Sequence, residues 1–498
     1  MKRAILALAL ALPSTILAAD PTPLARGHPP RFEIDVSYVA NLVHWIDNLA
    51  GSSQGKTIAA YRRYWRQRYG MPDAGEMDLL RSWVAIRAKP VPTPEPAILN
   101  ERGCLPQPGD VIDWRRTFQT RSYEAADVDD FISSLSAELS AQESATLRRV
   151  IEKFRGRFDA AWKETGYLPR FESKLKPFLA ESGLAGYLGE VASFFGVDPD
   201  AAPPGRIELM ALPEEGPTHA QADGRYLLIE IRPGDEPRDQ IQVIAHETSH
   251  YLWHQLDPGR NDALARRVFA SGASPAMEWR LLREALPTAL GQGLADARFS
   301  PATFRETGAW YHVADVDALA KAIFPAVRDA FRDGRRLEEK TIDEIARLGG
   351  AAPPIAAARP VDLVGDGFAA AGAGMGEALA RLRRDGPLRF SRLLDPRDAS
   401  DAAFASRYEC LGGVVLLGPG DLLAPGRVAP PFAAEDPVGA PAAAAPVSRI
   451  LATRRSGGGV VFQLVAARAE DADRLVTAFL GLQTIPAGPV PLEPPRPP

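Results

Sequence analysis

The sequence predicts an α+β protein, with a small sheet and its helices between a mainly helical N-terminal region and a small C-terminal α/β region. Apolar residues recur at helical spacing over much of the first 200 residues. Two aliphatic runs near residues 206–231 are typical of strands, and strand and helix patterns alternate between residues 361 and 485. With 498 residues, 46% of them hydrophobic, the chain is long enough to bury several cores. We therefore expect two to four domains.

The first 19 residues have the pattern of a secretory signal peptide. A basic start at residues 1–3 precedes an apolar run at 4–12, and small residues follow up to Ala18 and Ala19. Cleavage is expected after one of these alanines, so the protein is predicted to be exported, either to a periplasm or out of the cell. The apolar run is shorter than the ~20 residues that a spanning helix needs, and no later segment reaches that length. No membrane span is therefore predicted.

Residues 20–200 are predicted to form the helical N-terminal region. Between residues 31 and 90 the apolar side chains repeat with the period of an amphipathic helix, and a proline-rich break at 90–96 ends this part. Residues 123–198 continue with further amphipathic helices. The positions that define the first helical stripe are Val36, Val39, Leu42, Val43, Ile46 and Leu49.

Residues 201–349 are predicted to hold a small sheet followed by helices. Residues 206–212 and 226–231 are rich in aliphatic side chains and predict two strands joined by a loop. Residues 313–349 predict helices, and an Ala- and Pro-rich stretch at 350–360 marks a boundary. The core positions expected in these helices are Leu319, Ile323, Val327 and Phe331.

Residues 361–485 are predicted to form a small accessory α/β region. Strand patterns occur at 414–417 and 460–465, and a final helix is expected through 475–480. The glycine-rich segment at 454–459 predicts a hairpin turn and not a phosphate-binding loop, because no helix follows it directly. A low-complexity insertion is expected at 425–446, and a Pro-rich, extended and disordered tail at 486–498.

The pentapeptide His-Glu-Thr-Ser-His at residues 246–250 carries the chemistry of the second region. Two histidines at i and i+4 lie one above the other on a helix face, so His246 and His250 can reach one metal ion. Glu247 is placed beside that ion without being a ligand, where it can take a proton from metal-bound water. The alternative is a pair of half-buried histidines that only form hydrogen bonds.

A third ligand is expected from a later helix. Glu284 lies among apolar and small residues, where an isolated carboxylate is costly but one bound to Zn²⁺ is compensated. Gly291, two turns further on, leaves room for this helix to approach the histidine helix. His254 is not expected to be a ligand, because it lies eight residues from His246, roughly 12 Å along a helix. Glu278 is the other candidate for the third ligand. The alternative is that Glu278 lies on a solvent-exposed face of its helix.

Residues 205–295 resemble the gluzincin metallopeptidases, the thermolysin-like group. In that family the HExxH helix is followed by a helix with a glutamate ligand in a Glu-Ala-aliphatic-small-Asp run, and residues 284–288, Glu-Ala-Leu-Pro-Thr, look like that run. The resemblance implies a zincin-like catalytic core with two histidines and one glutamate around zinc. Two positions depart from the pattern: Thr288 replaces the Asp that usually orients the first histidine, and Pro287 is expected to kink the second helix or mark its start.

The chemistry expected of such a site is hydrolysis of an amide. Bound zinc lowers the pKa of its water to about 7, Glu247 accepts the proton, and the hydroxide attacks a polarised carbonyl. Glu247 then passes the proton to the leaving amine. Tyr311 and His312 are candidate donors to the developing oxyanion. The alternative is that Tyr311 is a packed aromatic residue and His312 a surface histidine. The resemblance also implies that an edge strand pairs with an extended peptide substrate, although a sheet that only supports the helix is the alternative.

Charge and cysteine content limit the partners further. The net charge of −5 provides no basic footprint, so nucleic acid is not an expected partner. Cys104 and Cys410 are the two cysteines of the chain, and in an exported protein they can pair as a disulfide.

The function expected from these observations is that of an exported zinc metallopeptidase acting on a peptide or protein. One alternative is an exported binding or envelope-assembly protein with a structural or catalytically idle zinc site. A second is a zinc hydrolase of another amide, for example in cell-wall peptide. The helices before residue 200 are also candidates for an inhibitory pro-segment.

Overall fold

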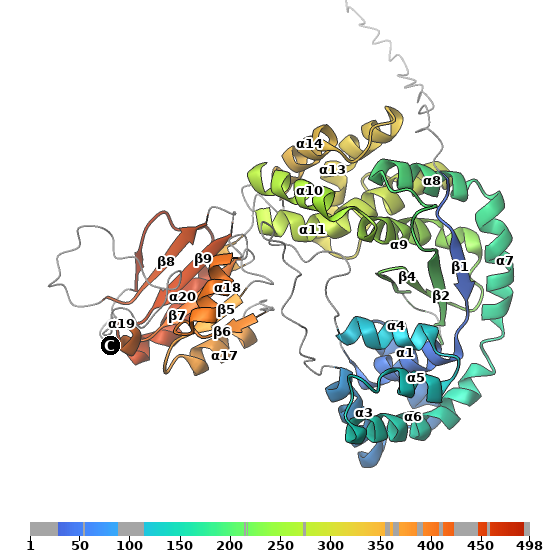
Figure 1. The fold of residues 1–498 in the computed structure, drawn as a ribbon, viewed down its shortest axis with the longest axis horizontal. Coiled ribbons are helices and arrows are strands. Elements are labelled where there is room, and N and C mark those ends of the chain that lie inside the picture. The colour runs from blue at the N-terminus through green and yellow to red at the C-terminus, as the bar shows by residue number, and fades with distance from the viewer. Residues whose placement is uncertain are drawn as a thin grey trace, which may run out of the picture.

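The structure is a computed structural model that combines many helices with two sheets, which gives the mixed α+β class expected from the sequence (Figure 1). It describes residues 28–52, 55–87, 114–213, 216, 218–271, 275–353, 359–361, 368–385, 392–407, 412–422, 447–455 and 459–492. The expected signal peptide, the proline-rich break at 90–96, the insertion at 425–446 and both cysteines lie outside the described residues.

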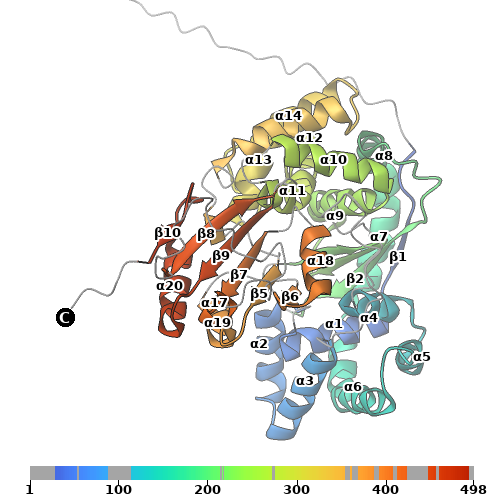
Figure 2. The same cartoon turned by 60° about the vertical axis from the view of Figure 1, so that its left-hand side comes forward.

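The N-terminal helices pack around their own core on one side of a four-stranded sheet (Figures 1 and 2). A buried ion pair holds two of them together, since Arg87 Nη2 lies 2.9 Å from Asp47 Oδ2 and Trp83 Nε1 donates to the same carboxylate at 2.8 Å. These helices are α1 (Tyr38–Ala50), α2 (Ile58–Tyr69), α3 (Ala74–Arg87), α4 (Trp114–Glu124), α5 (Val128–Ser134) and α6 (Ala141–Trp162).

The four-stranded sheet has the strand order β1-β2-β4-β3. β1, β2 and β4 run parallel, and β3 lies antiparallel to β4 at the edge. The strands are β1 (Phe32–Asp35), β2 (Gly205–Ala211), β3 (Ala220–Asp223) and β4 (Tyr226–Ile231).

β2 and β4 confirm the two strands predicted from aliphatic runs. The predictions for the segments that form the other two strands, β1 and β3, were wrong. β1 falls in a stretch expected to be helical, and β3 in one expected to be a loop. β1 has only four residues, too few to show an alternating pattern. β3 reads Ala-Gln-Ala-Asp and lacks the β-branched and aromatic residues that favour strands. Pairing with the buried strands β2 and β4 outweighs these weak local preferences.

The two faces of the sheet pack against different helices because side chains alternate along each strand. Leu227 and Ile229 belong to the main core that includes α9, while Tyr226 and Leu228 pack with Tyr123 of α4. The sheet therefore separates the N-terminal helices from the helices that carry the candidate site.

The second group of helices covers the opposite face of this sheet (Figures 1 and 2). It contains the helices expected at 313–349, and the predicted core positions there are all buried. The helices are α7 (Tyr167–Glu181), α8 (Leu184–Phe195), α9 (Ile241–His254), α10 (Pro258–Ser271), α11 (Pro275–Thr288), α12 (Asp296–Phe299), α13 (Ala314–Arg332) and α14 (Glu339–Gly350).

The C-terminal residues form a six-stranded sheet in the order β10-β8-β9-β7-β5-β6, with helices on both faces. β7 and β9 confirm the strands expected at 414–417 and 460–465. The expected hairpin is confirmed because β8 and β9 pair antiparallel, and α20 confirms the final helix. Within the tail expected to be extended and disordered at 486–498, residues 490–491 form the short strand β10, and residues 493–498 lie outside the described part of the chain. The elements are β5 (Phe368–Ala371), α17 (Gly376–Asp385), β6 (Arg392–Leu394), α18 (Ala399–Arg407), β7 (Gly413–Leu417), α19 (Pro419–Leu422), β8 (Arg449–Arg454), β9 (Val460–Val465), α20 (Ala472–Gly481) and β10 (Val490–Pro491).

Among the described helices, none combines the length and the apolar character needed to cross a bilayer.

Candidate metal and catalytic site

Helix α9 holds the His-Glu-Thr-Ser-His motif in the interior of the molecule. A 3₁₀ turn at Pro237–Gln240 leads into the helix, capped by reciprocal hydrogen bonds between Glu236 and Asp239. Ile244 and Leu252 are fully buried in the main core and fix the rotation of α9 about its axis. The motif residues are therefore held in one orientation by apolar packing.

The structure brings together the three side chains expected to bind metal. Nε2 of His246 and Nε2 of His250 lie 3.1 Å apart. Oε2 of Glu284, on α11, lies 3.6 Å from the first nitrogen and 3.5 Å from the second. Within the described part of the chain, these are the residues whose donor atoms form a possible metal-binding group of three.

The spacing of the three donor atoms fits a tetrahedral zinc ion. Bonds of about 2.1 Å in tetrahedral geometry place neighbouring donor atoms about 3.4 Å apart. The observed separations of 3.1, 3.5 and 3.6 Å lie on either side of this value. Two imidazole nitrogens and one carboxylate oxygen are also a donor set that zinc prefers in catalytic sites. The three ligands leave a fourth corner for water or substrate.

The electrostatics of the site suit a cation. Burial alone would raise the pKa of Glu284, but hydrogen bonding and attraction to His246 and His250 lower that pKa well below its ordinary value. The carboxylate is therefore ionised at neutral pH. Its side chain is 43% exposed, so the site is reachable from solvent.

The helix after Glu284 approaches α9 closely at Gly291. A Cβ atom built on Gly291 would lie 2.6 Å from the carbonyl oxygen of Gln242 and 2.9 Å from Cβ of His246. Real Cβ atoms essentially never come so near to other atoms. The close approach predicted for this glycine is thus confirmed.

Gln292 contacts the first histidine on the side away from the candidate metal position. Nδ1 of His246 lies 3.1 Å from Oε1 of Gln292. Thr288, which stands where the gluzincin pattern has Asp, is directed elsewhere, because its hydroxyl donates to the backbone oxygen of Glu284 at 2.7 Å. Gln292 belongs to a π-helical segment, Ala289–Ala295, that continues α11.

Glu247 is the expected general base and lies buried beside the histidines. Glu247 follows His246 on α9, and only 6% of its surface is exposed. Burial raises the pKa of Glu247, with further raising by Glu284 and Asp223 and partial lowering by the two imidazoles. A raised pKa brings a carboxylate closer to the range where it accepts and returns a proton near neutral pH.

Tyr311 reaches the site and His312 does not. The hydroxyl of Tyr311 donates to Oε2 of Glu284 at 3.2 Å, and its ring lies parallel to that of His246 with 5.9 Å between centroids. Burial, followed by the charge of Glu284, raises the pKa of Tyr311, so it remains a hydrogen-bond donor. His312 is exposed and touches only the Tyr311 ring among the described contacts.

Asp317 fixes the backbone that carries Tyr311. Its Oδ1 accepts from the backbone N–H groups of Trp310 at 2.6 Å and Tyr311 at 3.1 Å. Burial alone would raise the pKa of Asp317, but Lys321 and these two donors lower it. Asp317 stands in the first turn of α13, where a carboxylate is also favoured by the helix dipole.

Glu278, the other candidate ligand, lies apart from the histidines. It is 1% exposed in the first turn of α11, and neither carboxylate oxygen has a hydrogen-bond partner. It packs against Gly349 of α14, where an added Cβ would lie 2.9 Å from its Oε1. Burial raises the pKa of Glu278 to about 8. It is therefore neither a solvated residue nor, in this geometry, a metal ligand.

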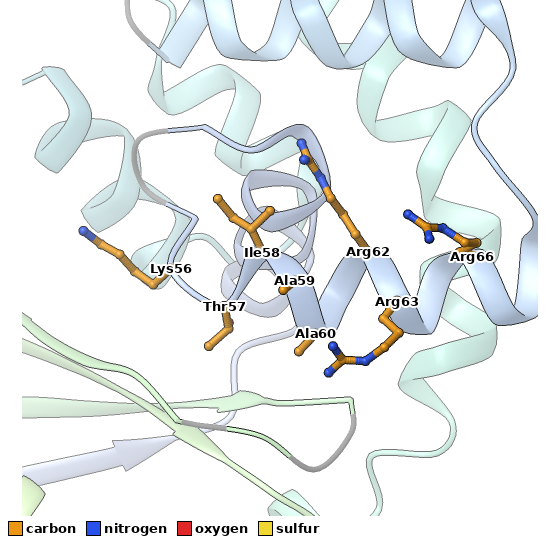
Figure 3. A pocket seen from close by; sticks show the side chains of 8 residues that line it. All are labelled: Lys56, Thr57, Ile58, Ala59, Ala60, Arg62, Arg63 and Arg66. Atoms are coloured by element: carbon orange, nitrogen blue, oxygen red, sulfur yellow. The ribbon is translucent and has the colours of Figure 1, made fainter. Parts of the chain in front are cut away.

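A separate cavity of about 720 Å³ opens beside the first turns of α2 (Figure 3). Its described lining includes Lys56, Arg62, Arg63 and Arg66, and contains no histidine, cysteine, aspartate or glutamate. In its described lining it offers no metal ligand and no carboxylate or imidazole base.

No family model, no curated protein and no solved structure matches this chain. The function must therefore be argued from the site itself.

Sequence reasoning missed two residues of this site, Gln292 and Asp317. Gln292 lies eight residues after Glu284, a spacing that would turn it away from the ligand face of a regular α-helix. Asp317 could have been suspected as an acidic residue in the first turn of a predicted helix, but nothing in the sequence ties it to Tyr311. Both depend on backbone geometry that a residue pattern does not show.

Proposed function

We propose that the protein is an exported zinc-dependent metallopeptidase of the gluzincin type, with a zincin-like core formed by the four-stranded sheet and helices α9 and α11. The observation that carries this proposal is the convergence of His246, His250 and Glu284 with zinc-like spacing, next to a buried Glu247. A zinc ion held there would lower the pKa of its bound water to about 7 and polarise the substrate carbonyl.

Glu247 acts as the general base and then as the general acid. It accepts the proton of the attacking water, and it later gives a proton to the nitrogen of the leaving amine. Its burial, which raises its pKa, favours acceptance of the proton in the first step. A site that served only to hold a structural metal would not need this buried carboxylate.

Tyr311 is the donor that we assign to the developing oxyanion. Its hydroxyl already lies within hydrogen-bond distance of the ligand Glu284, and a preorganised donor at this position stabilises charge that appears on the substrate oxygen. The exposed position of His312 makes it the weaker candidate.

The edge strand β3 is the surface where an extended substrate is expected to bind. β3 ends the sheet in the described residues and contacts α9, so a peptide paired with it would run past the motif. Ala220 and Ala222 lie opposite Ile229 and Leu227, on the sheet face that packs toward α9.

The experiment that tests this function measures zinc content and peptide cleavage on purified mature protein. The parent is compared with Glu247→Gln, and Glu278→Gln on α11 serves as a control for loss of a buried carboxylate away from the site. We expect stoichiometric zinc in all three proteins, cleavage of a quenched peptide mixture by the parent and the control, and a loss of at least about 10³-fold in kcat for Glu247→Gln.

Other results would point to other functions. Zinc without cleavage in the parent would favour a binding or envelope-assembly protein, and cleavage of cell-wall peptide alone would favour an amide hydrolase of that substrate. Absence of bound zinc from the parent would contradict the site itself.

A further inference from the structure

The segment after the third ligand is a π-helix, and this form is uncommon. Ala289–Ala295 continues α11 with wider turns, as shown at its end by the N–H of Asp296 bonding to the carbonyl of Gly291. Isolated π-helical turns occur frequently at functional sites because they shift the side chains that follow them. Pro287, just upstream, cannot supply the backbone N–H that a regular helix would use at that position.

The wider turn changes which residue faces the histidine helix. In a regular α-helix with 100° per residue, Gln292 would point about 80° away from the direction of Glu284. Four π-type steps of roughly 82° bring it to within about 10° of that direction. The π segment therefore places Glu284 and Gln292 on one face, two turns apart. Gly291 beside them allows the backbone to contact α9.

The side chain of Gln292 decides which nitrogen of His246 carries the proton. Its Oε1 is an acceptor only and lies 3.1 Å from Nδ1, so this contact favours the neutral tautomer with the proton on Nδ1. Nε2 is then left with a free lone pair, and this is the atom that lies with His250 and Glu284. The geometry selects the tautomer that binds metal.

We propose that Gln292 is the positioning residue of His246, and that the π-helical turn exists in this chain to bring it there. The inference rests on the proposed function and adds a residue to it. In the gluzincin pattern a carboxylate four residues after the ligand orients the histidine. Here Thr288 stands at that position, and its hydroxyl donates to the backbone oxygen of Glu284 instead.

A neutral amide in this position has a chemical consequence. An amide oxygen accepts the Nδ1 proton without adding charge, so it makes the imidazole a weaker base than a carboxylate would. His246 then donates less electron density to the ion. We expect zinc to bind more weakly than with an acidic partner, and Gln292→Glu to bind zinc at least as tightly as the parent.

The test measures zinc affinity by competition with a chromophoric chelator, on metal-free protein reloaded with zinc. Gln292→Met removes the acceptor at nearly constant volume, and Gln292→Ala is measured beside it in case one variant does not fold. Gln292→Glu restores an acceptor. Gln242→Met, a glutamine one turn before His246 with no described side-chain hydrogen bond, is the matched control.

We expect a 10–100-fold rise in the dissociation constant for zinc in Gln292→Met, no change in Gln242→Met, and full recovery in Gln292→Glu, with the melting temperatures of the metal-free proteins alike. A folded Gln292→Met whose affinity is within twofold of the parent, or a Gln292→Glu as weak as Gln292→Met, would overturn the positioning role while leaving the proposed function standing. A parent that binds no zinc would overturn both.

Discussion

At the scale of single residues, Tyr311 and His312 are adjacent in the chain but differ in what they contact. Tyr311 donates to the ligand Glu284 and stacks on His246, while His312 faces solvent. Of these two residues, only the tyrosine is therefore positioned to assist the proposed reaction. The backbone anchor Asp317 keeps it there without contacting the ligands in the described bonds.

Replacement of Tyr311 by Phe is expected to lower kcat by about 10²–10³-fold, the usual cost of losing one oxyanion donor. Zinc content should not change, because Phe keeps the ring beside His246 and Glu284 keeps its place. The measurement is peptide cleavage at saturating substrate with zinc analysis in parallel. His312→Ala is the matched control, and a larger loss there than in Tyr311→Phe would reverse the assignment.

Glu278 makes the stability of the fold depend on pH. Its pKa is raised by burial from 4.5 to about 8 in the folded chain, so the folded state holds this proton more tightly than the unfolded state does. The free energy of unfolding is therefore expected to fall as pH rises between these two values, by on the order of 3 kcal/mol.

Glu278→Met tests this dependence, because it replaces an unpartnered carboxyl with an apolar side chain of similar length. Denaturant unfolding at pH 5 and pH 8 should show the variant gaining about 1–3 kcal/mol over the parent at the higher pH and much less at the lower one. Parallel pH profiles for the two proteins would mean that folding does not raise the pKa of the Glu278 carboxyl.

The residues of the candidate metal site differ in how far the sequence predicts them. His246, Glu247 and His250 are close in sequence and on one helix, so their spacing is enough to place them. Glu284 could be inferred from its apolar neighbours and from the family resemblance, with Glu278 as a competitor until the structure separated the two. Gln292 could not be inferred, because its direction depends on a π-helical turn that helical periodicity does not describe.

At the scale of elements, the site depends on the close contact between α9 and the π segment. Gly291 makes that contact possible, since any side chain there would meet the backbone of Gln242 and His246. The packing of these two helices sets the distance between Glu284 and the histidines.

Gly291→Ala is expected to destabilise the protein by about 1–3 kcal/mol and to weaken zinc binding, because the added methyl forces the two helices apart. Gly186 in the first turn of α8 is a matched control, since nothing lies within 4 Å of the position of its Cβ. Gly186→Ala should gain about 0.5–1 kcal/mol from helix propensity. Both variants are measured by thermal unfolding and by zinc competition. Equal melting temperatures and zinc affinities for the two variants would show that the contact between the helices is looser than described.

Element prediction succeeded where side-chain patterns are strong and failed where tertiary pairing decides. The long amphipathic helices and the aliphatic strands β2 and β4 were predictable from their own residues. The short strands β1, β3 and β10 have two to four residues each and form because a neighbouring strand offers its edge.

At the scale of the whole molecule, the N-terminal helices are bound to the sheet of the candidate site through buried polar groups. Asn41 of α1 donates to the carbonyl of Leu209 and accepts from the N–H of Ala211, both on β2. His44 of the same helix lies 2.7 Å from the buried carboxylate of Glu230 on β4. These contacts make the N-terminal region a structural partner of the sheet.

This arrangement argues against a removable pro-segment. Removal of residues 20–200 would take away β1 and expose one whole face of the sheet, and Glu230 would lose its contacts with His44 and Thr57. We expect the truncated chain to be insoluble and the intact mature chain to cleave peptide without prior processing. Expression of both forms, with N-terminal sequencing of the active species, tests this. A soluble, active fragment that begins near residue 200 would restore the pro-segment hypothesis.

The position of the metal itself is the decisive measurement, obtained by anomalous diffraction at the zinc edge on crystals of the zinc-loaded protein. Zinc bound at the proposed site gives one strong peak within about 2.1 Å of Nε2 of His246, Nε2 of His250 and a carboxylate oxygen of Glu284, with Gln292 on the far side of His246. Stoichiometric zinc with its peak at any other place in the chain would rule out this site.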